Sequence, residues 1–402
     1  MKRIFSLSVI LFLALSAAMP ADACTSAIFT GKSTPDGRPL LWKHRDTGEL
    51  NNRIEFFPSG NGRKYSFIGL VNSPVQDGEV WTGTNEVGFS IMNTASYNLQ
   101  SETADIEDQE GAVMYQALGS CKTLKDFEKL LDKMNKPRGV EANFGVIDAE
   151  GGAAYYEVNN TEWRKIDVND PKIAPEGFLV YTNHSYTGRK DEGMGYVRYN
   201  TANEIIHKGW IRGEEFTPQW IFNKLSRSYY NSLLGIDLGK NPEIAPEGWF
   251  VDQDFIPRRS TSAAVVVKGV KPGENPELTV MWTILGYPPC GLAMPMFVAS
   301  KEEQPEKMVK GAEGNNCQMC DEALERRAKV FPLKRGNGKN YMNIKEAMMF
   351  MYDLYPYEAM MFDFMNEALE EMYKKGKFDK ELYQSVLSKS MVELNVEEQD
   401  LP

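Results

Sequence analysis

The chain has 402 residues, of which 42% are hydrophobic and 25% charged, and its formal net charge is −11. These fractions are ordinary for a soluble globular protein, and the length allows one elaborated domain or two. Because an acidic surface gains nothing from the phosphate charges of DNA or RNA, the charge excludes nucleic-acid binding as a main function.

Residues 1–23 are typical of a secretory signal peptide. A positively charged start and an apolar run over 4–18 lead to the small-x-small exit Ala21-Asp22-Ala23. This pattern predicts cleavage directly before Cys24 and export to the periplasm or the extracellular space. No later apolar run approaches the roughly 20 residues that cross a bilayer, so we expect no integral membrane segment after cleavage.

Cleavage before Cys24 would place a thiol and a free α-amine on one residue. An α-amine has a pKa of about 8 and is partly a neutral base near neutral pH. A thiolate is a strong nucleophile, so this residue would supply both halves of a nucleophile–base pair. Two other interpretations of Cys24 are a disulfide partner and a lipid-attachment site. Lipidation favours a large apolar residue three positions earlier, where this chain has Ala21.

From Cys24 onward, short strands bounded by turns alternate with amphipathic helices. We expect strands over 26–29, 40–43, 53–57, 65–71, 80–82, 89–92, 144–147, 153–158, 178–181, 263–267 and 278–284. We expect helices over 111–118, 123–134, 196–206, 220–225 and from about 343 to the end. Meandering strands with short turns favour antiparallel sheets, and the whole pattern predicts a layered α+β fold.

This pattern divides the chain into four parts: the signal peptide, a catalytic domain over 24–300, a polar Gly-rich loop over 301–340 and a helical extension over 341–402. One helix face in the extension carries Met361, Met365, Ala368 and Met372, and Gly376 is expected to end that helix. A methionine-rich face can form a binding groove. We favour the simpler interpretation that it packs on the catalytic domain.

Besides Cys24, the chain has four cysteines: Cys121, Cys290, Cys317 and Cys320. Export implies an oxidising compartment, so we expect a disulfide among them. Four cysteines allow three pairings, and the sequence does not choose between them. The spacing Cys317-x-x-Cys320 is also compatible with zinc, but no second pair or histidine follows it, and we disfavour a metal site.

Several motifs resemble the N-terminal nucleophile hydrolases, in the branch of choloylglycine hydrolase, penicillin V acylase and isopenicillin-N acyltransferase. The motifs, in chain order, are Cys24-Thr25-Ser26, Asp36-Gly37, Lys43-His44-Arg45-Asp46, Asn85-Glu86-x-Gly88-Phe89, Asn93, Thr182-Asn183-His184 and Arg259-Ser260-Thr261-Ser262. The resemblance spans about 24–298 and does not cover the tail after about 343. It implies a four-layer αββα sandwich with two antiparallel sheets, here followed by a C-terminal helical extension.

The resemblance implies five catalytic residues: Cys24, Asp46, Asn93, Asn183 and Arg259. Cys24 would attack an amide carbonyl while Asp46 holds and tunes its α-amine. The two asparagines would donate hydrogen bonds to the tetrahedral oxyanion, where one such donor is worth about 3 kcal/mol. Arg259 would organise charge near the nucleophile, with Arg258 as the adjacent alternative. Taken singly, Asp46 and the asparagines are also compatible with turn or cap positions.

The motif around Asp46 departs from the family pattern Arg-Asn-x-Asp. Lys43 replaces the arginine and His44 the asparagine. Lysine keeps the charge but lacks the planar fork of a guanidinium, which weakens any substrate assignment that depends on bidentate binding. We retain Lys43 and Arg198 as candidate substrate-binding residues. The alternative for Arg198 is a solvated helix face.

A Cys24–His184 dyad with Asn183 nearby is a second catalytic hypothesis, because it would mimic a papain-like site. No papain-like sequence surrounds Cys24, so we prefer the N-terminal amine as the base.

The resemblance therefore implies an exported linear-amide hydrolase or acyltransferase that needs no metal or organic cofactor. Candidate substrates are N-acyl amino acids, conjugated bile acids, β-lactam side-chain amides and small peptides. A dipeptidase of the related cysteine branch is one alternative, and a secreted binding protein with an oxidised or lipidated Cys24 is another. The sequence does not determine the oligomeric state, although relatives in the acyl-hydrolase branch are often homotetramers.

Overall fold

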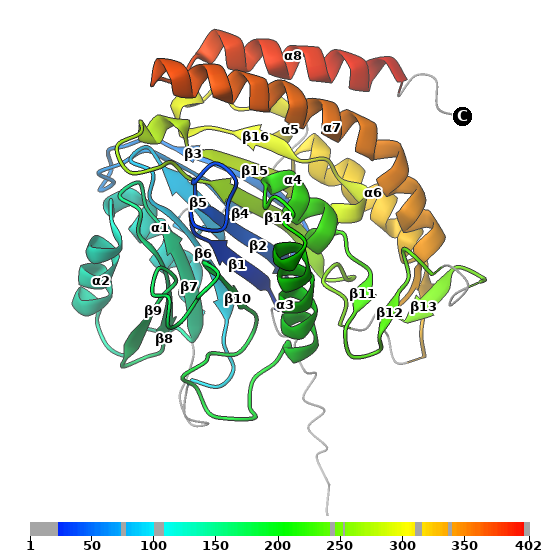
Figure 1. Cartoon of the computed structure of the whole chain (residues 1–402), viewed down its shortest axis with the longest axis horizontal. Helices are drawn as coiled ribbons and strands as arrows, with labels where there is room; N and C mark the ends of the chain where they lie inside the picture. The colour runs from blue at the N-terminus through cyan, green and yellow to red at the C-terminus, as the bar shows by residue number, and fades with distance from the viewer. Residues whose placement is uncertain are drawn as a thin grey trace, which may run out of the picture.

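Two antiparallel sheets form the centre of the molecule. The computed structural model describes residues 23–73, 78–99, 108–241, 246–251, 254–309, 316–336 and 340–397, and it describes side chains up to residue 390. The strands of the first sheet are β1 (Thr25–Phe29), β2 (Leu40–Asp46), β10 (Phe178–Tyr181), β14 (Thr261–Lys268), β15 (Val280–Leu285) and β16 (Met294–Met296). Their order across the sheet is β10-β1-β2-β14-β15-β16, which puts β1 and β2 in the interior (Figure 1).

The second sheet is a meander in which each strand pairs with its neighbour in the chain. Its strands are β3 (Asn52–Phe57), β4 (Phe67–Asn72), β5 (Thr82–Asn85), β6 (Ser90–Ala95), β7 (Ala142–Ile147), β8 (Ala153–Val158) and β9 (Trp163–Asp167). Asn85 closes the turn between β5 and β6, because its side-chain oxygen accepts from the amides of Val87 and Phe89. Gly88 in this turn has a φ of 79°, which a residue without a Cβ adopts easily.

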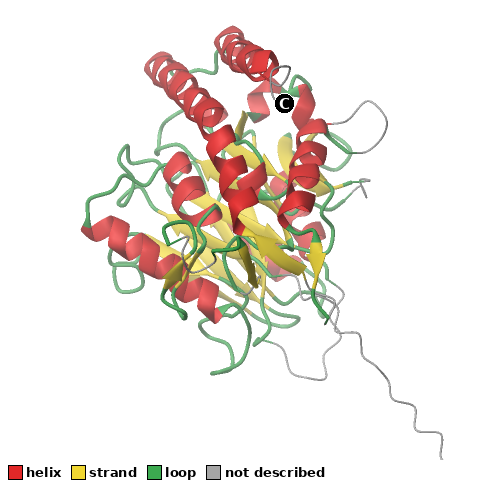
Figure 2. Ribbon diagram, turned by 90° about the vertical axis from the view of Figure 1, so that its right-hand side faces the viewer, coloured by secondary structure: helices red, strands yellow, loops and turns green. Residues whose placement is uncertain are grey.

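Helices cover the outer face of each sheet, so the layers follow the predicted order αββα (Figures 1 and 2). The second sheet is covered by α1 (Glu110–Ser120) and α2 (Leu124–Lys133). The first sheet is covered by α3 (Tyr196–Ile211), α4 (Pro218–Ile221), the π-helical turn η1 (Phe222–Ser226) and α7 (Ile344–Lys375), and α8 (Lys380–Glu397) lies against α7.

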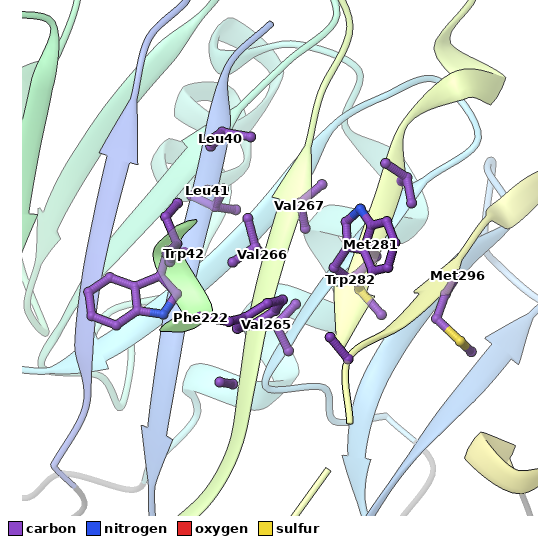
Figure 3. Close-up of a cluster of buried hydrophobic side chains, with 14 of the residues drawn as sticks. Leu40, Leu41, Trp42, Phe222, Val265, Val266, Val267, Met281, Trp282 and Met296 are labelled. Atoms are coloured by element: carbon purple, nitrogen blue, oxygen red, sulfur yellow. The ribbon is translucent and has the colours of Figure 1, made fainter. Parts of the chain in front are cut away.

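The largest core joins the first sheet to its covering helices. Figure 3 shows Trp42, Phe222 and Trp282 among the aliphatic side chains of this cluster. The Trp42 indole donates to Ser226 Oγ at 2.9 Å, and the rings of Trp282 and Phe362 stack with centroids 4.0 Å apart. The methionine face of α7 is buried here, which confirms that the C-terminal helices pack on the sheet domain.

The remaining elements are short. They are β11 (Tyr230–Asn231), β12 (Ile236–Asp237), β13 (Trp249–Val251), β17 (Leu333–Lys334), β18 (Asn340–Asn343), α5 (Glu306–Val309), and the 3₁₀ turns η3 (Pro276–Leu278), η4 (Pro288–Cys290) and η5 (Val298–Ser300). In the part of the chain that the structure describes, no helix is both long and apolar enough to span a bilayer.

The predicted loop over 301–340 is wrong in its central part. Helix α6 (Gln318–Val330) occupies it, with α5 before it and β17 and β18 after it. Met319, Ala323, Arg327 and Val330 recur at helical spacing and are buried against the rest of the domain. The other polar and charged residues of this stretch lie on its solvent-exposed face. Because they outnumber the buried residues, the narrow apolar stripe is not evident in the sequence.

The expected disulfide is absent, since Cys121, Cys290, Cys317 and Cys320 are all buried thiols without a disulfide partner. Cys121 packs in the core under α1 and α2, whereas Cys290 lies in a separate cluster. Cys317 Sγ donates to the Asn52 carbonyl at 3.4 Å, and Cys320 Sγ accepts from the Asn52 amide at 3.4 Å. The pair at the start of α6 is therefore held by hydrogen bonds to the backbone of the first residue of β3.

Candidate active site

Cys24 is buried directly before β1, in the interior of the first sheet. Hydrogen bonds to the main chain hold the peptide groups on both sides of Cys24. The Ala23 amide donates to the Asp46 carbonyl at 3.2 Å, and Arg198 Nη1 donates to the Cys24 carbonyl at 2.6 Å. By strand alternation, the Cys24 side chain lies on the same side as that of Ser26, whose hydroxyl contacts the second sheet. The thiol is therefore directed toward the space between the sheets.

Asp46 ends β2, and its carboxylate is buried beside the start of β14. Oδ1 accepts from Thr261 Oγ1 at 2.6 Å, and Oδ2 accepts from Arg258 Nε at 2.8 Å. Arg258 Nη2 also donates to the Ala23 carbonyl at 3.3 Å. A bulge directly after Thr261 interrupts the β2–β14 register at this level. A carboxylate and a guanidinium thus lie beside the Ala23–Cys24 peptide bond.

The structure places Arg258, rather than Arg259, against Asp46. A tight turn brings this about: the Thr261 amide donates to the Arg258 carbonyl at 2.8 Å, and the Arg258 amide donates to Thr261 Oγ1 at 3.0 Å. Arg259 is exposed on this turn, and its carbonyl accepts from Arg327 Nε at 3.0 Å. The prediction for Arg259 is therefore corrected to its neighbour, the alternative named from the sequence.

Lys43 reaches from β2 to the second sheet. Its ammonium donates to Asn93 Oδ1 and to the Trp81 carbonyl, both at 2.6 Å. Lys43 and Asn93, the latter on β6, are both buried. Lys43, a candidate substrate-binding residue, is thus hydrogen-bonded to Asn93, a candidate donor to the oxyanion.

Arg198 is fully buried on α3, so the solvated helix face is excluded. Its guanidinium donates to the Cys24 carbonyl, to Thr25 Oγ1 at 2.8 Å and to Asn183 Oδ1 at 2.8 Å. Asn183 Nδ2 in turn donates to the Ala95 carbonyl at 2.9 Å, two residues from Asn93 on β6. Arg198 therefore connects the nucleophile's backbone with the second candidate oxyanion donor.

His44 lies between the cations of this site. Burial lowers its pKa to about 4, the charges of Arg198 and Arg258 act in the same direction, and Asp46 opposes them. The ring is therefore neutral near pH 7, and its Nε2 lies 3.2 Å from Thr261 Oγ1. Burial and the Arg258 charge also lower the pKa of Arg198 to about 10. This value is still well above 7, and the guanidinium is therefore protonated near neutral pH.

His184 belongs to an aromatic group beside Asn183. Its ring stacks on Tyr196 with centroids 4.2 Å apart, and its Nδ1 lies 3.1 Å from Thr182 Oγ1 and 3.3 Å from the Met194 carbonyl. Burial lowers the pKa of His184. These contacts indicate a packing role and give the dyad hypothesis no support.

Arg198 thus links the Cys24 carbonyl to Asn183, Arg258 links the Ala23 carbonyl to Asp46, and Lys43 binds Asn93 on the facing sheet. Sequence reasoning missed the contribution of Thr261 to Asp46 and of Thr25 to Arg198. The motif around Thr261 is the sequence feature that could have indicated the contact with Asp46, because a hydroxyl at the start of one strand can hydrogen-bond to the end of the neighbouring strand. Within the described residues, no cluster of three or more His, Cys, Asp or Glu side chains is suited to a metal ion.

No protein-family model matches the chain, and neither does any curated protein sequence. Solved structures to which it is similar include an N-acylethanolamine-hydrolyzing acid amidase ortholog from Caenorhabditis elegans, at 14% identity over 61% of this chain and 92% of that chain, with a TM-score of 0.38.

Two further structures are a mutant conjugated bile acid hydrolase from Clostridium perfringens and penicillin V acylase from Agrobacterium tumefaciens. The first is 13% identical over 69% of this chain and 93% of that chain, with a TM-score of 0.40. The second is 12% identical over 65% of this chain and 83% of that chain, with a TM-score of 0.33.

Proposed function

We propose that this chain is an exported amide hydrolase or acyltransferase of the N-terminal nucleophile type, which forms a thioester on Cys24. The observation that carries the proposal is the group of contacts around the Ala23–Cys24 peptide. Asp46 and Arg258 bind Ala23, and Arg198 binds the Cys24 carbonyl. Hydrolysis of that peptide bond by a signal peptidase would leave the new α-amine within this group.

In acylation, Cys24 Sγ attacks the carbonyl carbon of the substrate amide, and the α-amine of the same residue takes the thiol proton. Negative charge develops on the carbonyl oxygen, where the side-chain N–H groups of Asn93 and Asn183 stabilise it. The C–N bond then breaks as the α-ammonium gives its proton to the leaving nitrogen. The products are a free amine and a thioester on Cys24.

In deacylation, the α-amine takes a proton from water while the water oxygen attacks the thioester carbonyl. The C–S bond breaks, the thiolate regains its proton, and a carboxylic acid leaves. An amine in place of water gives acyl transfer. Asp46 favours the protonated amine and Arg258 opposes this, so the two together tune the base toward the working pH.

The test combines intact mass with turnover of a panel of N-acyl amino acids, conjugated bile acids, β-lactam side-chain amides and dipeptides. We expect exported protein to begin at Cys24 and to hydrolyse at least one class of amide. Cys24→Ala should reduce kcat by about 10⁴-fold or more, as for other catalytic nucleophiles. Cys121→Ala, a buried thiol in a distant core, is the matched control and should keep normal turnover.

Two results would overturn the proposal. One is a mature chain that begins at another residue, and the other is full turnover by Cys24→Ala. A lipid mass on Cys24 without turnover of any amide would instead support a secreted binding protein.

A further inference from the structure

Each candidate oxyanion asparagine has its side-chain oxygen bound by a buried cation. Lys43 Nζ lies 2.6 Å from Asn93 Oδ1, and Arg198 Nη2 lies 2.8 Å from Asn183 Oδ1. Ammonium and guanidinium groups donate hydrogen bonds and accept none. The atom that each contacts must therefore be the amide oxygen, and this decides how both amides are oriented.

The orientation of these amides matters because the terminal torsion of asparagine has two broad, nearly equivalent states. In one state the NH₂ group faces a developing oxyanion, and in the other the carbonyl oxygen does, which repels it. For Asn183 a second contact agrees with the first, since Nδ2 donates to the Ala95 carbonyl at 2.9 Å. One NH₂ group carries two hydrogens, so this bond fixes the amide plane without using the whole donor group.

The two cations are themselves held by the protein. Lys43 also donates to the Trp81 carbonyl, and Arg198 also donates to the Cys24 carbonyl and to Thr25. Both side chains are at most 2% exposed. The charged groups of Lys43 and Arg198 therefore bind oxygens of the protein itself. This arrangement suits residues that position other side chains, whereas a residue that binds substrate presents its charge at an accessible surface.

We propose that Lys43 and Arg198 are positioning residues that lock the amides of Asn93 and Asn183 with their N–H groups toward the oxyanion. This inference rests on the proposed function. It also replaces the assignment of both cations to substrate binding. A locked donor acts mainly in the transition state, so loss of the lock lowers kcat and leaves KM nearly unchanged.

A double-mutant cycle on kcat tests the Lys43 lock. The variants are Lys43→Met, Asn93→Ala and the double variant, assayed on the best amide from the panel. Removing one oxyanion donor costs about 10²–10³-fold, so Asn93→Ala should lose that much and Lys43→Met about 10–100-fold. In the Asn93→Ala background, Lys43→Met should cost less than about threefold, because the lock has no amide left to orient.

Arg45→Met is the matched control. Arg45 lies two residues further on the same face of β2 and binds Asn52 and Asn72, two asparagines outside the candidate site. Its loss should lower stability but leave kcat per folded molecule near the wild-type value. Lys43→Arg keeps the charge and donors and should recover part of the activity lost in Lys43→Met.

A second arm uses Arg198→Lys and Asn183→Ala, since removal of the whole Arg198 side chain risks misfolding. The same non-additivity is expected. Additive losses in both cycles would overturn the inference, and so would a rise in KM confined to acidic substrates with kcat unchanged. Absence of turnover by the wild-type protein would instead refute the proposed function, so the two failures are distinguishable.

Discussion

At the scale of single residues, His44 is a base of the candidate site whose pKa is strongly lowered by burial. It is completely buried among Asp46, Arg198 and Arg258, and its pKa falls from 6.5 to about 4. Between these values the unfolded chain binds the proton and the folded chain does not. Folding stability therefore rises with pH across this window and is lost as the pH falls from 6.5 through 4.

We predict that His44→Gln removes this part of the acid sensitivity. Glutamine keeps a polar group near Thr261 but does not titrate, so the variant should lack a loss of about 3 kcal/mol between pH 6.5 and 4. Urea unfolding of wild type and variant from pH 4 to pH 8 measures the difference. A stability difference that stays constant over this range would contradict the prediction.

At the scale of elements, one buried ion pair joins α7 to the helices over the first sheet. Arg227 and Glu358 form two parallel bonds of 2.6 Å, and Glu358 Oε2 also accepts from the Ala293 amide at 2.8 Å. Arg227 binds the carbonyls of Pro288 and Gly291, both at 2.9 Å. Removing one partner of such a pair leaves the other charge buried without compensation.

We predict that Glu358→Ala lowers the free energy of unfolding by about 3 kcal/mol or more. Glu371→Ala is the control on the same helix, because Glu371 pairs with Lys375 in solvent and its loss should cost less than about 1 kcal/mol. Replacing both partners, in Arg227→Met with Glu358→Leu, should restore much of the loss. Unfolding in guanidinium chloride measures each variant. If Glu358→Ala and Glu371→Ala lowered the free energy of unfolding equally, the buried ion pair would contribute no more than the exposed one.

At the scale of the whole molecule, the C-terminal helices are part of the sandwich. Met361, Phe362, Met365, Leu369 and Met372 are at most 2% exposed and pack on the first sheet. Full burial of one such side chain contributes about 1.5–3 kcal/mol, so together they contribute on the order of 10 kcal/mol. This is comparable to the entire stability of an ordinary domain.

We predict that a chain shortened to residues 24–343 does not fold cooperatively, because it exposes the face formed by β14, β15 and β16. A chain shortened to 24–376 keeps α7 and loses only α8, whose Tyr383 donates to the Pro295 carbonyl at 2.8 Å. It should fold with a lower melting temperature. Circular dichroism melts compare the two, and a sharp, near-native transition of 24–343 would contradict the prediction.

Most elements follow from local signals in the chain. Thr123 caps α2 and accepts from the Asp126 amide, and Gly376 ends α7 in the left-handed region, as the sequence predicts. Among the strands of the two central sheets, β9 and β16 were not predicted. The helix α6 was not predicted either, nor were the short elements α5, β11, β12, β13, β17 and β18. β9 is half exposed, β16 has three residues with Pro295 at its centre, and α6 has a narrow apolar stripe. The two strands lack a clear alternation, and the stripe of α6 is interrupted by the charged Arg327, which weakens its apolar period.

For the site, short motifs in the chain were enough to point to the candidate nucleophile, the carboxylate at the end of β2 and the two asparagines. Which groups the buried cations contact could be seen only in the folded chain. Lys43 and Asn93 are 50 residues apart, Arg198 and Cys24 are 174 apart, and Arg258 and Asp46 are 212 apart. Local sequence specifies strands and turns, whereas contacts at such separations exist only once the sheets have stacked, α3 has packed over β1 and the turn before β14 has directed Arg258 toward Asp46.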